Sequence, residues 1–201
     1  MNVAPRSFTA EISRKSLHLL TGLVPLIYAL GMSRDRVILV LALMCLGMLA
    51  IERLRRTHHR FARIFQAAFG RMLRSFETTK FLGATHYCFA SLICVAGFDR
   101  HLAVLALLYL ALGDTAASLV GLAFGSLRVG RKSLEGFLAF WLACSLTALI
   151  AWIAQPAYPL EPALLAALLA GLVELLLDPR INDNLAIPLT AVLTMWLVGL
   201  A

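Results

Sequence analysis

Long apolar runs constrain this chain more than any other feature of its sequence. The hydrocarbon layer of a membrane is about 30 Å thick, and an α-helix needs about 20 mostly apolar residues to cross it. These runs predict an all-α fold, a polytopic integral membrane helical bundle with about seven transmembrane helices. Runs near the required length cover residues 17–32, 37–51, 81–98, 102–124, 134–154, 160–177 and 185–201.

The composition agrees with a membrane bundle rather than a soluble globule. Hydrophobic residues make up 61% of the chain and charged residues 14%, which leaves too little polar surface to cover a water-soluble fold. Most connections between runs are too short to fold alone, so we expect one transmembrane domain over residues 1–201. No A-x-A cleavage pattern follows residues 28–32, and the first run is therefore expected to be retained. The cysteines also fall inside apolar runs, without zinc-ligand or disulfide spacing, as expected of small hydrophobic residues: Cys45, Cys88, Cys94 and Cys144.

The basic residues are distributed unevenly between alternate connections. If the N-terminus is cytoplasmic, the inside segments hold 15 of the 18 basic residues, and only Arg34, Arg36 and Arg100 lie outside. The positive-inside rule therefore predicts a cytoplasmic N-terminus and an external C-terminus. Because the basic residues flank the runs, the net charge of +7 indicates anionic inner-leaflet lipids as partners rather than nucleic acid. The compact chain suits a bacterial inner membrane.

The longest inside connection, residues 52–80, is basic and contains an apolar stripe. Its aromatic and methionine residues recur every three or four positions, with arginines between them. The pattern predicts an amphipathic helix lying on the inner leaflet, although the same stripe could pack against the bundle. The stripe consists of Phe61, Phe65, Phe69, Met72 and Phe76, and the arginines are Arg60, Arg63, Arg71 and Arg74.

Several ionisable residues lie inside or at the ends of apolar runs. A charge near the bilayer centre costs about 2.5 to 3.5 kcal/mol on insertion scales, so such residues usually have a function. Asp114 is the clearest case, since counting from Leu102 at about 1.5 Å per residue places it roughly two-thirds of the way across the membrane, toward the cytoplasm. Glu174 and Glu135 lie near the cytoplasmic ends of theirs, and Arg14 and His18 are expected to share a helix face. All of these groups are expected to converge at the cytoplasmic face.

Small residues around Asp114 recur at a spacing of four. Gly113, Ala117, Gly121 and Gly125 could simply let a neighbouring helix approach closely, which is a frequent use of such stripes in membranes. A packing stripe does not need Asp114, however. The carboxylate therefore favours a functional interpretation of this segment.

Two cytoplasmic connections carry the groups that phosphate chemistry requires. Loop 125–133 contains glycines, backbone donors and Lys132, which suit it to binding phosphates, although a basic inside loop is also a topology signal. Segment 178–184 offers carboxylate and amide oxygens suited to Mg²⁺, although an ordinary turn would use similar residues. Carboxylates, a lysine and a glycine-hinged loop at one surface are typical of phosphoryl transfer. No Walker motif is present, which excludes a P-loop kinase.

The sequence resembles a known enzyme family in this region. Segment 113–118, with the letters G-D-T-A-A-S, precedes Gly121, Gly125 and the G-R-K-S-L-E-G segment 130–136. This pattern resembles the signature of the CTP-dependent lipid kinases, which include dolichol kinase, the phytol and farnesol kinases and the yeast-type diacylglycerol kinase.

Two further segments extend the resemblance over nearly the whole chain. Residues 14–18 match the R-K-x-x-H opening of that family. Glu174 together with the D-N-L-A-I-P segment 183–188 is similar to its closing E...D-N-L-x-x-P element. One departure is Leu122, where many relatives carry arginine, and either basic residue of the following loop could substitute: Arg128 or Arg131.

The resemblance implies an activity and a set of site residues. It implies transfer of the terminal phosphate of CTP, or another nucleotide, to the hydroxyl of a polyprenol, another isoprenoid alcohol or diacylglycerol, assisted by Mg²⁺. Asp114 and Asp183 are then expected to hold the metal, with help from Asn184, while loop 125–133 and Lys132 bind the phosphates. The expected nucleotide-binding residues are Arg14, Lys15, His18, Gly113, Gly121, Gly125, Gly130, Arg131, Lys132, Ser133 and Asn184.

The partner of the lipid hydroxyl stays open between two carboxylates. Asp114, Glu135 and Glu174 are the expected catalytic residues, and either glutamate could contact the hydroxyl because spacing does not distinguish a base from a metal ligand. A second hypothesis is a phosphatidate cytidylyltransferase, but the sequence lacks the late K-D-x-x-x-P-G-H-G-G-x-x-D-R motif of those enzymes. A third is a lipid-phosphate transporter or flippase, although no internal repeat is evident. Lipid chain length and a homo-oligomeric state are also open.

Overall fold

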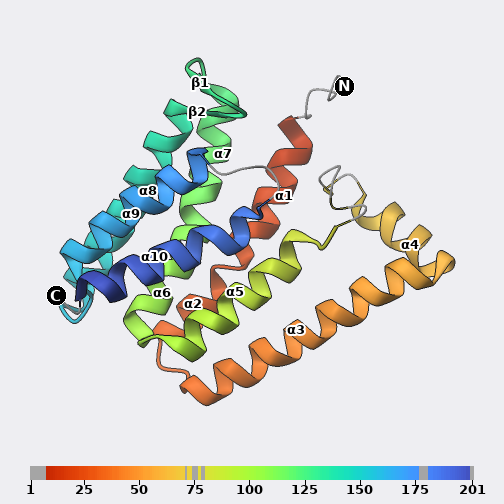
Figure 1. Cartoon of the computed structure of the whole chain (residues 1–201), viewed down its shortest axis with the longest axis horizontal. Coiled ribbons are helices and arrows are strands. Elements are labelled where there is room, and N and C mark those ends of the chain that lie inside the picture. The colour runs from red at the N-terminus through yellow and green to blue at the C-terminus, as the bar shows by residue number, and fades with distance from the viewer. Residues whose placement is uncertain (1–7, 71, 74–76, 78–79, 177–180, 200–201) are drawn as a thin grey trace.

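Helices make up most of the chain that the structure describes (Figure 1). The computed structural model describes residues 8–70, 72, 73, 77, 80–176 and 181–199. The helices are α1 (Phe8–Leu20), α2 (Leu23–Ala29), α3 (Arg34–Thr57), α4 (His59–Phe69), α5 (Gly83–Gly97), α6 (Arg100–Leu108), the π-helix η2 (Tyr109–Gly113), α7 (Asp114–Ala123), α8 (Leu134–Ala154), α9 (Leu160–Leu176) and α10 (Asp183–Gly199). A short hairpin, β1 (Arg128–Val129) and β2 (Lys132–Ser133), connects α7 to α8.

Three helical stretches are long and apolar enough to cross a membrane. They are α3, the continuous helix formed by α6, η2 and α7, and α8. The shorter helices α5 and α10 are also apolar. Among the described residues, the structure therefore agrees with a helical membrane bundle, while the full number of seven crossings stays a prediction.

The first predicted span differs from the structure. A single helix was expected over 17–32, but α1 ends at Leu20 and a separate α2 covers only Leu23–Ala29. A Cβ at Gly22 would lie 3.4 Å from the Cβ of Ala111 and 3.0 Å from the Leu19 carbonyl oxygen, so the chain passes close to η2 at the break. The two helices together run from Phe8 to Ala29 and begin earlier than expected.

The outward faces of the long helices are apolar. On α3, Leu39, Leu43 and Leu46 are exposed at steps of four and three. On α8, Leu142, Leu146, Ile150 and Ile153 repeat this pattern. Continuous apolar stripes of this size are unfavourable in water but are expected on surfaces that face lipid.

The middle of the bundle is formed around α6. Its residues 103–107 are buried on all sides, because α2, α5, α8 and α10 pack around this helix. A helix that is apolar all round is typical of the centre of a large bundle. The continuation of α6 through η2 carries Asp114 out of this core.

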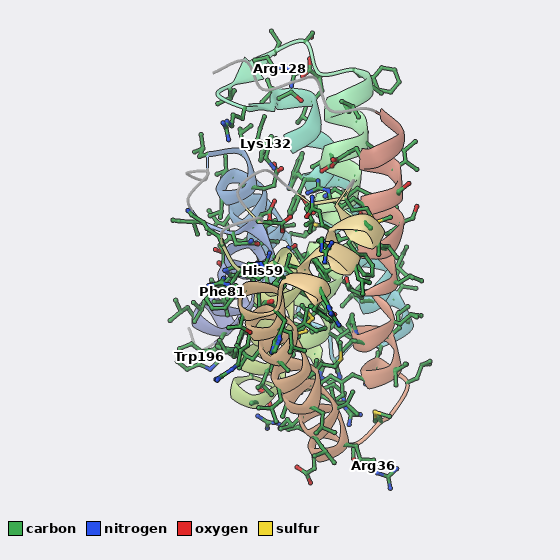
Figure 2. All side chains as sticks on the ribbon, turned by 90° about the vertical axis from the view of Figure 1, so that its right-hand side faces the viewer. Arg36, His59, Phe81, Arg128, Lys132 and Trp196 are labelled. Carbon is green, nitrogen blue, oxygen red and sulfur yellow. The ribbon has the colours of Figure 1, made fainter. Side chains whose placement is uncertain are left out.

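The connections between helices gather at two ends of the molecule (Figure 1). At one end lie the start of α1, the end of α7, the hairpin, the start of α8 and the start of α10. We call it the hairpin end. The turns before α3, α6 and α9 lie at the opposite end. Figure 2 shows Arg128 and Lys132 at the hairpin end and Arg36 at the other.

The predicted amphipathic helix forms as α4, but it is shorter than its stripe. It ends at Phe69, and Met72 lies beyond it. Arg71, Arg74 and Phe76 lie outside the described residues. Of the predicted stripe, α4 therefore carries Phe61, Phe65 and Phe69.

Candidate functional site

A π-helical segment positions Asp114 at the start of α7. An inserted π turn shifts the hydrogen-bond ladder and leaves a backbone carbonyl without its usual helical N–H partner. The carbonyl of Leu110, inside this segment, accepts a hydrogen bond from His18 Nε2 over 3.1 Å. A carbonyl can only accept, so this contact requires the proton of His18 on Nε2. The π segment thus ties α1 to the helix that carries Asp114.

Lys15 and His18 of α1 both reach the Asp114 carboxylate. Lys15 Nζ donates to Asp114 Oδ2 and, over 3.0 Å, to the backbone carbonyl of Asp114. His18 Nε2 lies 3.4 Å from Asp114 Oδ2. Arg14, four positions before His18 on the same helix, pairs with Glu11 rather than with the Asp114 carboxylate. Lys15 and His18, three positions apart, share the face that contacts α7.

The second oxygen of Asp114 has no partner among the described residues. Asp114 is 2% exposed, and its Oδ1 atom is buried without a hydrogen bond. Leaving a charged oxygen buried and unpaired is costly, so such an atom in a polar cluster indicates a place for a ligand. A metal ion or a hydrogen-bond donor would satisfy it.

A second ion pair lies beside the first. Lys132 Nζ, from the hairpin, donates to Glu174 Oε1 on α9. The Glu174 side chain is buried, whereas that of Lys132 is 37% exposed. Burial alone would lower the pKa of Lys132, but the carboxylates of Glu174, Asp114 and Asp183 outweigh it and raise the pKa above its ordinary value. The lysine is therefore held as a cation facing the cluster.

Asp183 joins these groups from the first turn of α10. It is buried and interacts electrostatically with Lys15, His18 and Lys132. The structure therefore brings together side chains from five elements, α1, α7, β2, α9 and α10, in what we call the Asp114 cluster. Its members are Lys15, His18, Asp114, Lys132, Glu174 and Asp183. Asp178, Pro179 and Arg180, expected to contribute oxygens or charge, lie outside the described residues.

Asn184 lies next to Asp183 but contacts another helix. Its backbone N–H donates to Asn182 Oδ1 over 3.0 Å and to Asp183 Oδ1 over 3.1 Å. Its side chain lies against Gly83 at the start of α5, where a Cβ would come 2.5 Å from Asn184 Nδ2. Asn184 therefore links α10 to α5 beside the cluster.

The expected phosphate-binding loop is a β-hairpin. Arg128 pairs with Ser133 and Val129 with Lys132, so the turn consists of Gly130 and Arg131. Gly130 has a φ of +61°, which favours glycine in a two-residue hairpin turn. Arg131 is exposed at this turn. The pairing fixes the register of Lys132 relative to α8.

Glu135 holds this hairpin in place. Its Oε1 accepts from the backbone N–H groups of Ser126, over 2.9 Å, and Leu127, over 3.0 Å, and from the Ser126 hydroxyl. The other expected base, Glu174, pairs with Lys132 inside the cluster. The geometry thus gives Glu135 a structural contact and places Glu174 with the other charged groups.

The glycines of α7 lie where α8 and the hairpin approach. A Cβ at Gly113 would lie 2.6 Å from Cys144 Sγ, and one at Gly121 would lie 3.0 Å from Ser133 Oγ. A Cβ at Gly125 would lie 2.7 Å from the same hydroxyl oxygen. Ser133 also caps α8 by accepting from the Gly136 N–H over 3.2 Å. These contacts show helix packing, and a role of the glycines in nucleotide binding stays a prediction.

A buried acidic pair at the start of α5 was not expected from the sequence. Glu52 Oε1 accepts from the Leu82 N–H over 2.6 Å, and Glu77 Oε1 accepts from the Gly83 N–H over 2.7 Å. Arg55 Nε donates to Glu52 Oε2 over 2.8 Å. Both carboxylates thus satisfy N–H groups that open a helix, where negative charge is favoured. The sequence held one clue to this pair. Residues 53–76 are basic and contain no aspartate or glutamate, so Glu52 and Glu77 are the two acidic residues that border this segment.

Two carboxylates of the Asp114 cluster are of the residue type that could hold a magnesium ion together with other ligands. No group of three or more His, Cys, Asp or Glu side chains arranged for a metal occurs in the part of the chain that the structure describes. Mg²⁺ in nucleotide sites needs only one or two protein carboxylates, with waters and phosphates completing its shell. Asp114 Oδ1 and the Asp183 carboxylate would supply these. The cluster also holds three carboxylates against two lysines, which favours an added cation.

The comparisons with known proteins identify no relative. No family model, curated protein or solved structure matches this chain.

Proposed function

We propose that this protein is an integral membrane kinase that transfers the terminal phosphate of CTP to the hydroxyl of a lipid alcohol. The observation that carries the proposal is the Asp114 cluster, in which a buried carboxylate with an unsatisfied oxygen lies among two lysines and a histidine. Phosphoryl transfer depends mainly on positioning and on neutralising phosphate charge. The cluster offers cations for phosphates and carboxylates for a metal and a hydroxyl.

The basic residues suit the nucleotide phosphates. Lys132 is a partly exposed cation on a fixed hairpin strand, so it can exchange Glu174 for a phosphate oxygen. Lys15 and His18 lie deeper, where they hold Asp114 in position and donate toward phosphate when it enters. Arg131 at the hairpin turn would reach the outer part of the nucleotide.

The carboxylates divide into metal and hydroxyl partners. Asp114 and Asp183 would hold Mg²⁺, which supplies neutralisation of the phosphate charge when bound. Glu174 is then the carboxylate that accepts the proton of the lipid hydroxyl, since Glu135 is engaged with the hairpin. The oxygen of the alcohol forms a bond to the terminal phosphorus as the bond to CDP breaks. The products are a lipid monophosphate and CDP.

The membrane placement follows from the charge distribution. We assign seven crossings, with α1 and α2 forming the first and the hairpin end facing the cytoplasm, where the nucleotide is available. The lipid chain would enter sideways between helices, and only its head group would reach the Asp114 cluster. A bacterial inner membrane suits this arrangement.

A lipid-alcohol panel with CTP labelled at its terminal phosphate tests the reaction. We expect label in a lipid monophosphate of one polyprenol, isoprenoid alcohol or diacylglycerol, with CDP as the second product. Release of pyrophosphate from phosphatidate and CTP would instead identify a cytidylyltransferase. Movement of a lipid phosphate across vesicles without nucleotide turnover would identify a transporter. Either of these results would overturn the proposal.

The Asp114→Asn variant provides the sharpest test of the cluster. The amide keeps the size of the side chain but loses the charge needed by a metal, so phosphorylation should fall about 100-fold or more. The measurement is label transfer by purified protein whose α-helical content and elution volume match the wild type. Asp35→Asn, at the first turn of α3 and the opposite end, is the matched control and should keep full activity.

A further inference from the structure

Helix α4 leaves the bundle where a candidate membrane span ends. The span α3 finishes at Thr57, and His58 has extended backbone angles of φ −115° and ψ 105° that break the helix before α4 begins. None of the α4 side chains is buried, and its main neighbour among the described elements is α3. A helix in this position lies beside the membrane boundary and outside the bundle.

The two sides of α4 differ sharply in character. At about 100° per residue, Ile64, Phe61, Phe65 and Phe69 fall on one side. The rings of Phe61 and Phe65 lie 6.3 Å apart and those of Phe65 and Phe69 5.1 Å apart, so they form a continuous row. Ile64 is 69% exposed and Phe69 46%, and a contiguous exposed apolar patch, unlike a single exposed residue, marks an interaction surface. The aromatic row and Ile64 thus form an apolar face.

The other side of α4 and the end of α3 carry positive charge. Arg60, Arg63 and Gln66 occupy the polar side of α4 and are exposed. The sequence from Arg53 to Phe76 contains no aspartate or glutamate, so the local charge is of one sign. Basic residues flanking an apolar face are typical of helices that bind anionic lipid surfaces.

We infer that α4 binds the surface of an anionic leaflet at the hairpin side of the membrane. The apolar face with Ile64 and Phe69 enters the boundary between head groups and acyl chains, about 5–10 Å deep, and Arg60 and Arg63 contact lipid phosphates. This contact goes beyond phosphoryl transfer and does not depend on it. The lipid head groups, rather than a soluble anion, are the partner because the apolar face adjoins the charges.

Nitroxide labels on the full chain in lipid nanodiscs test the orientation of α4. Ile64→Cys places the label on the apolar face and Gln66→Cys, the matched control, places it on the polar side, with the native cysteines replaced by alanine. We expect the label at 64 to be accessible to oxygen and shielded from an aqueous nickel chelate, and the label at 66 to show the reverse. Equal access of the chelate to both labels would show that α4 lies off the membrane. Protection of position 64 from both reagents would show packing against protein instead.

The dependence of shielding on lipid charge distinguishes binding to anionic lipid from a purely apolar contact with the membrane. Shielding at position 64 should be greater in nanodiscs with phosphatidylglycerol than in pure phosphatidylcholine. The R60Q/R63Q double variant should lower the ratio of docked to undocked helix in the anionic nanodiscs by roughly fivefold for each arginine. No effect of either lipid charge or the two arginines would overturn the inference. Both measurements are independent of nucleotide, so they stand whether or not the kinase assay succeeds.

Discussion

At the residue scale, the Asp114 cluster concentrates ionisable groups where desolvation is expensive. Removing a charge from water costs several kcal/mol even after relaxation, and a close partner of opposite sign offsets part of it. Lys15 offsets it for Asp114 Oδ2, while Oδ1 has no protein partner among the described residues. Such an arrangement sacrifices stability and is expected where a ligand completes the site. The cluster should therefore respond strongly to loss of a single charge.

The Lys15→Met variant tests this dependence. Methionine keeps most of the apolar length but leaves the Asp114 carboxylate buried without its cation, so the free energy of unfolding should fall by about 3–5 kcal/mol. Thermal unfolding in detergent micelles measures the loss. Adding Asp114→Leu to Lys15→Met should recover most of it, because both charges are then gone. Arg36→Met, at the opposite end, serves as the control, and equal unfolding temperatures for all variants would contradict the buried pair.

At the element scale, small residues and one carboxylate determine how closely α7, the hairpin and α8 pack together. Gly113 and Gly121 allow α8 to approach α7 closely, and Glu135 fastens the loop between them. In a membrane, close backbone approach provides much of the association energy between helices because lipid contributes no hydrophobic driving force. The position of Lys132 depends on these contacts, since it lies on the second hairpin strand.

Enlarging Gly113 should separate the two helices. The added methyl of Gly113→Ala would lie 2.6 Å from Cys144 Sγ and 2.8 Å from the Phe140 ring, which forces one of them to move. Overpacking of this kind costs about 1–3 kcal/mol, measurable by thermal unfolding in detergent. Gly47→Ala in α3 is the matched control, since nothing lies within 4 Å of the added carbon, and it should change the free energy by no more than about 1 kcal/mol. A Gly113→Ala protein as stable as this control would refute the contact.

Removing the Glu135 carboxylate should loosen the hairpin. Glu135→Ala removes the acceptor for two backbone N–H groups, each worth about 1 kcal/mol or more. Amide hydrogen exchange at Ser126 and Leu127 should then quicken about tenfold, and trypsin should cut faster after Arg128 and Arg131. Glu161→Ala, in the first turn of α9 at the other end, should leave both rates unchanged. Unchanged exchange in Glu135→Ala would mean that the hairpin is held by other contacts.

At the scale of the whole molecule, the hairpin end and the opposite end are separated by the exposed apolar surface of the long helices. The long helices expose leucine and isoleucine stripes, and Lys132 of the Asp114 cluster lies toward the hairpin end (Figure 2). A site near a membrane boundary can admit a water-soluble nucleotide from one side and a lipid from the bundle's flank. The orientation of these ends in the membrane decides which compartment would supply the nucleotide of the proposed reaction.

Cysteine labelling from each side of sealed vesicles checks this orientation. Arg128→Cys should react with a membrane-impermeant maleimide only from the cytoplasmic side, and Arg36→Cys only from outside, because the two residues lie at opposite ends (Figure 2). The native cysteines are buried, so the wild type should remain unlabelled. Labelling of both variants from the same side would contradict the assigned topology.

The apolar runs by themselves determined the helical class and most helix positions, because the bilayer imposes length and hydrophobicity on each crossing. The exceptional charge inside a run also marked Asp114. Spacing could not show that Lys15, rather than Arg14, turns toward Asp114, since both lie on the same short helix. The break after Leu20 was equally hidden, and Gly22 within it lies close to Ala111, which is far away in the sequence.

Only the tertiary structure decided which charges meet. Sequence shows the residues that are costly to bury, but their partners come from helices far apart along the chain, and packing angles select them. Packing thus paired Lys132 with Glu174 and gave Glu135 to the hairpin, although both glutamates fit the same local pattern. It also capped α5 with Glu52 and Glu77, because the N–H groups at a helix start can donate to any carboxylate that the fold brings near. Local composition thus determined which side chains had to be buried, and long-range packing determined which partners they were buried against.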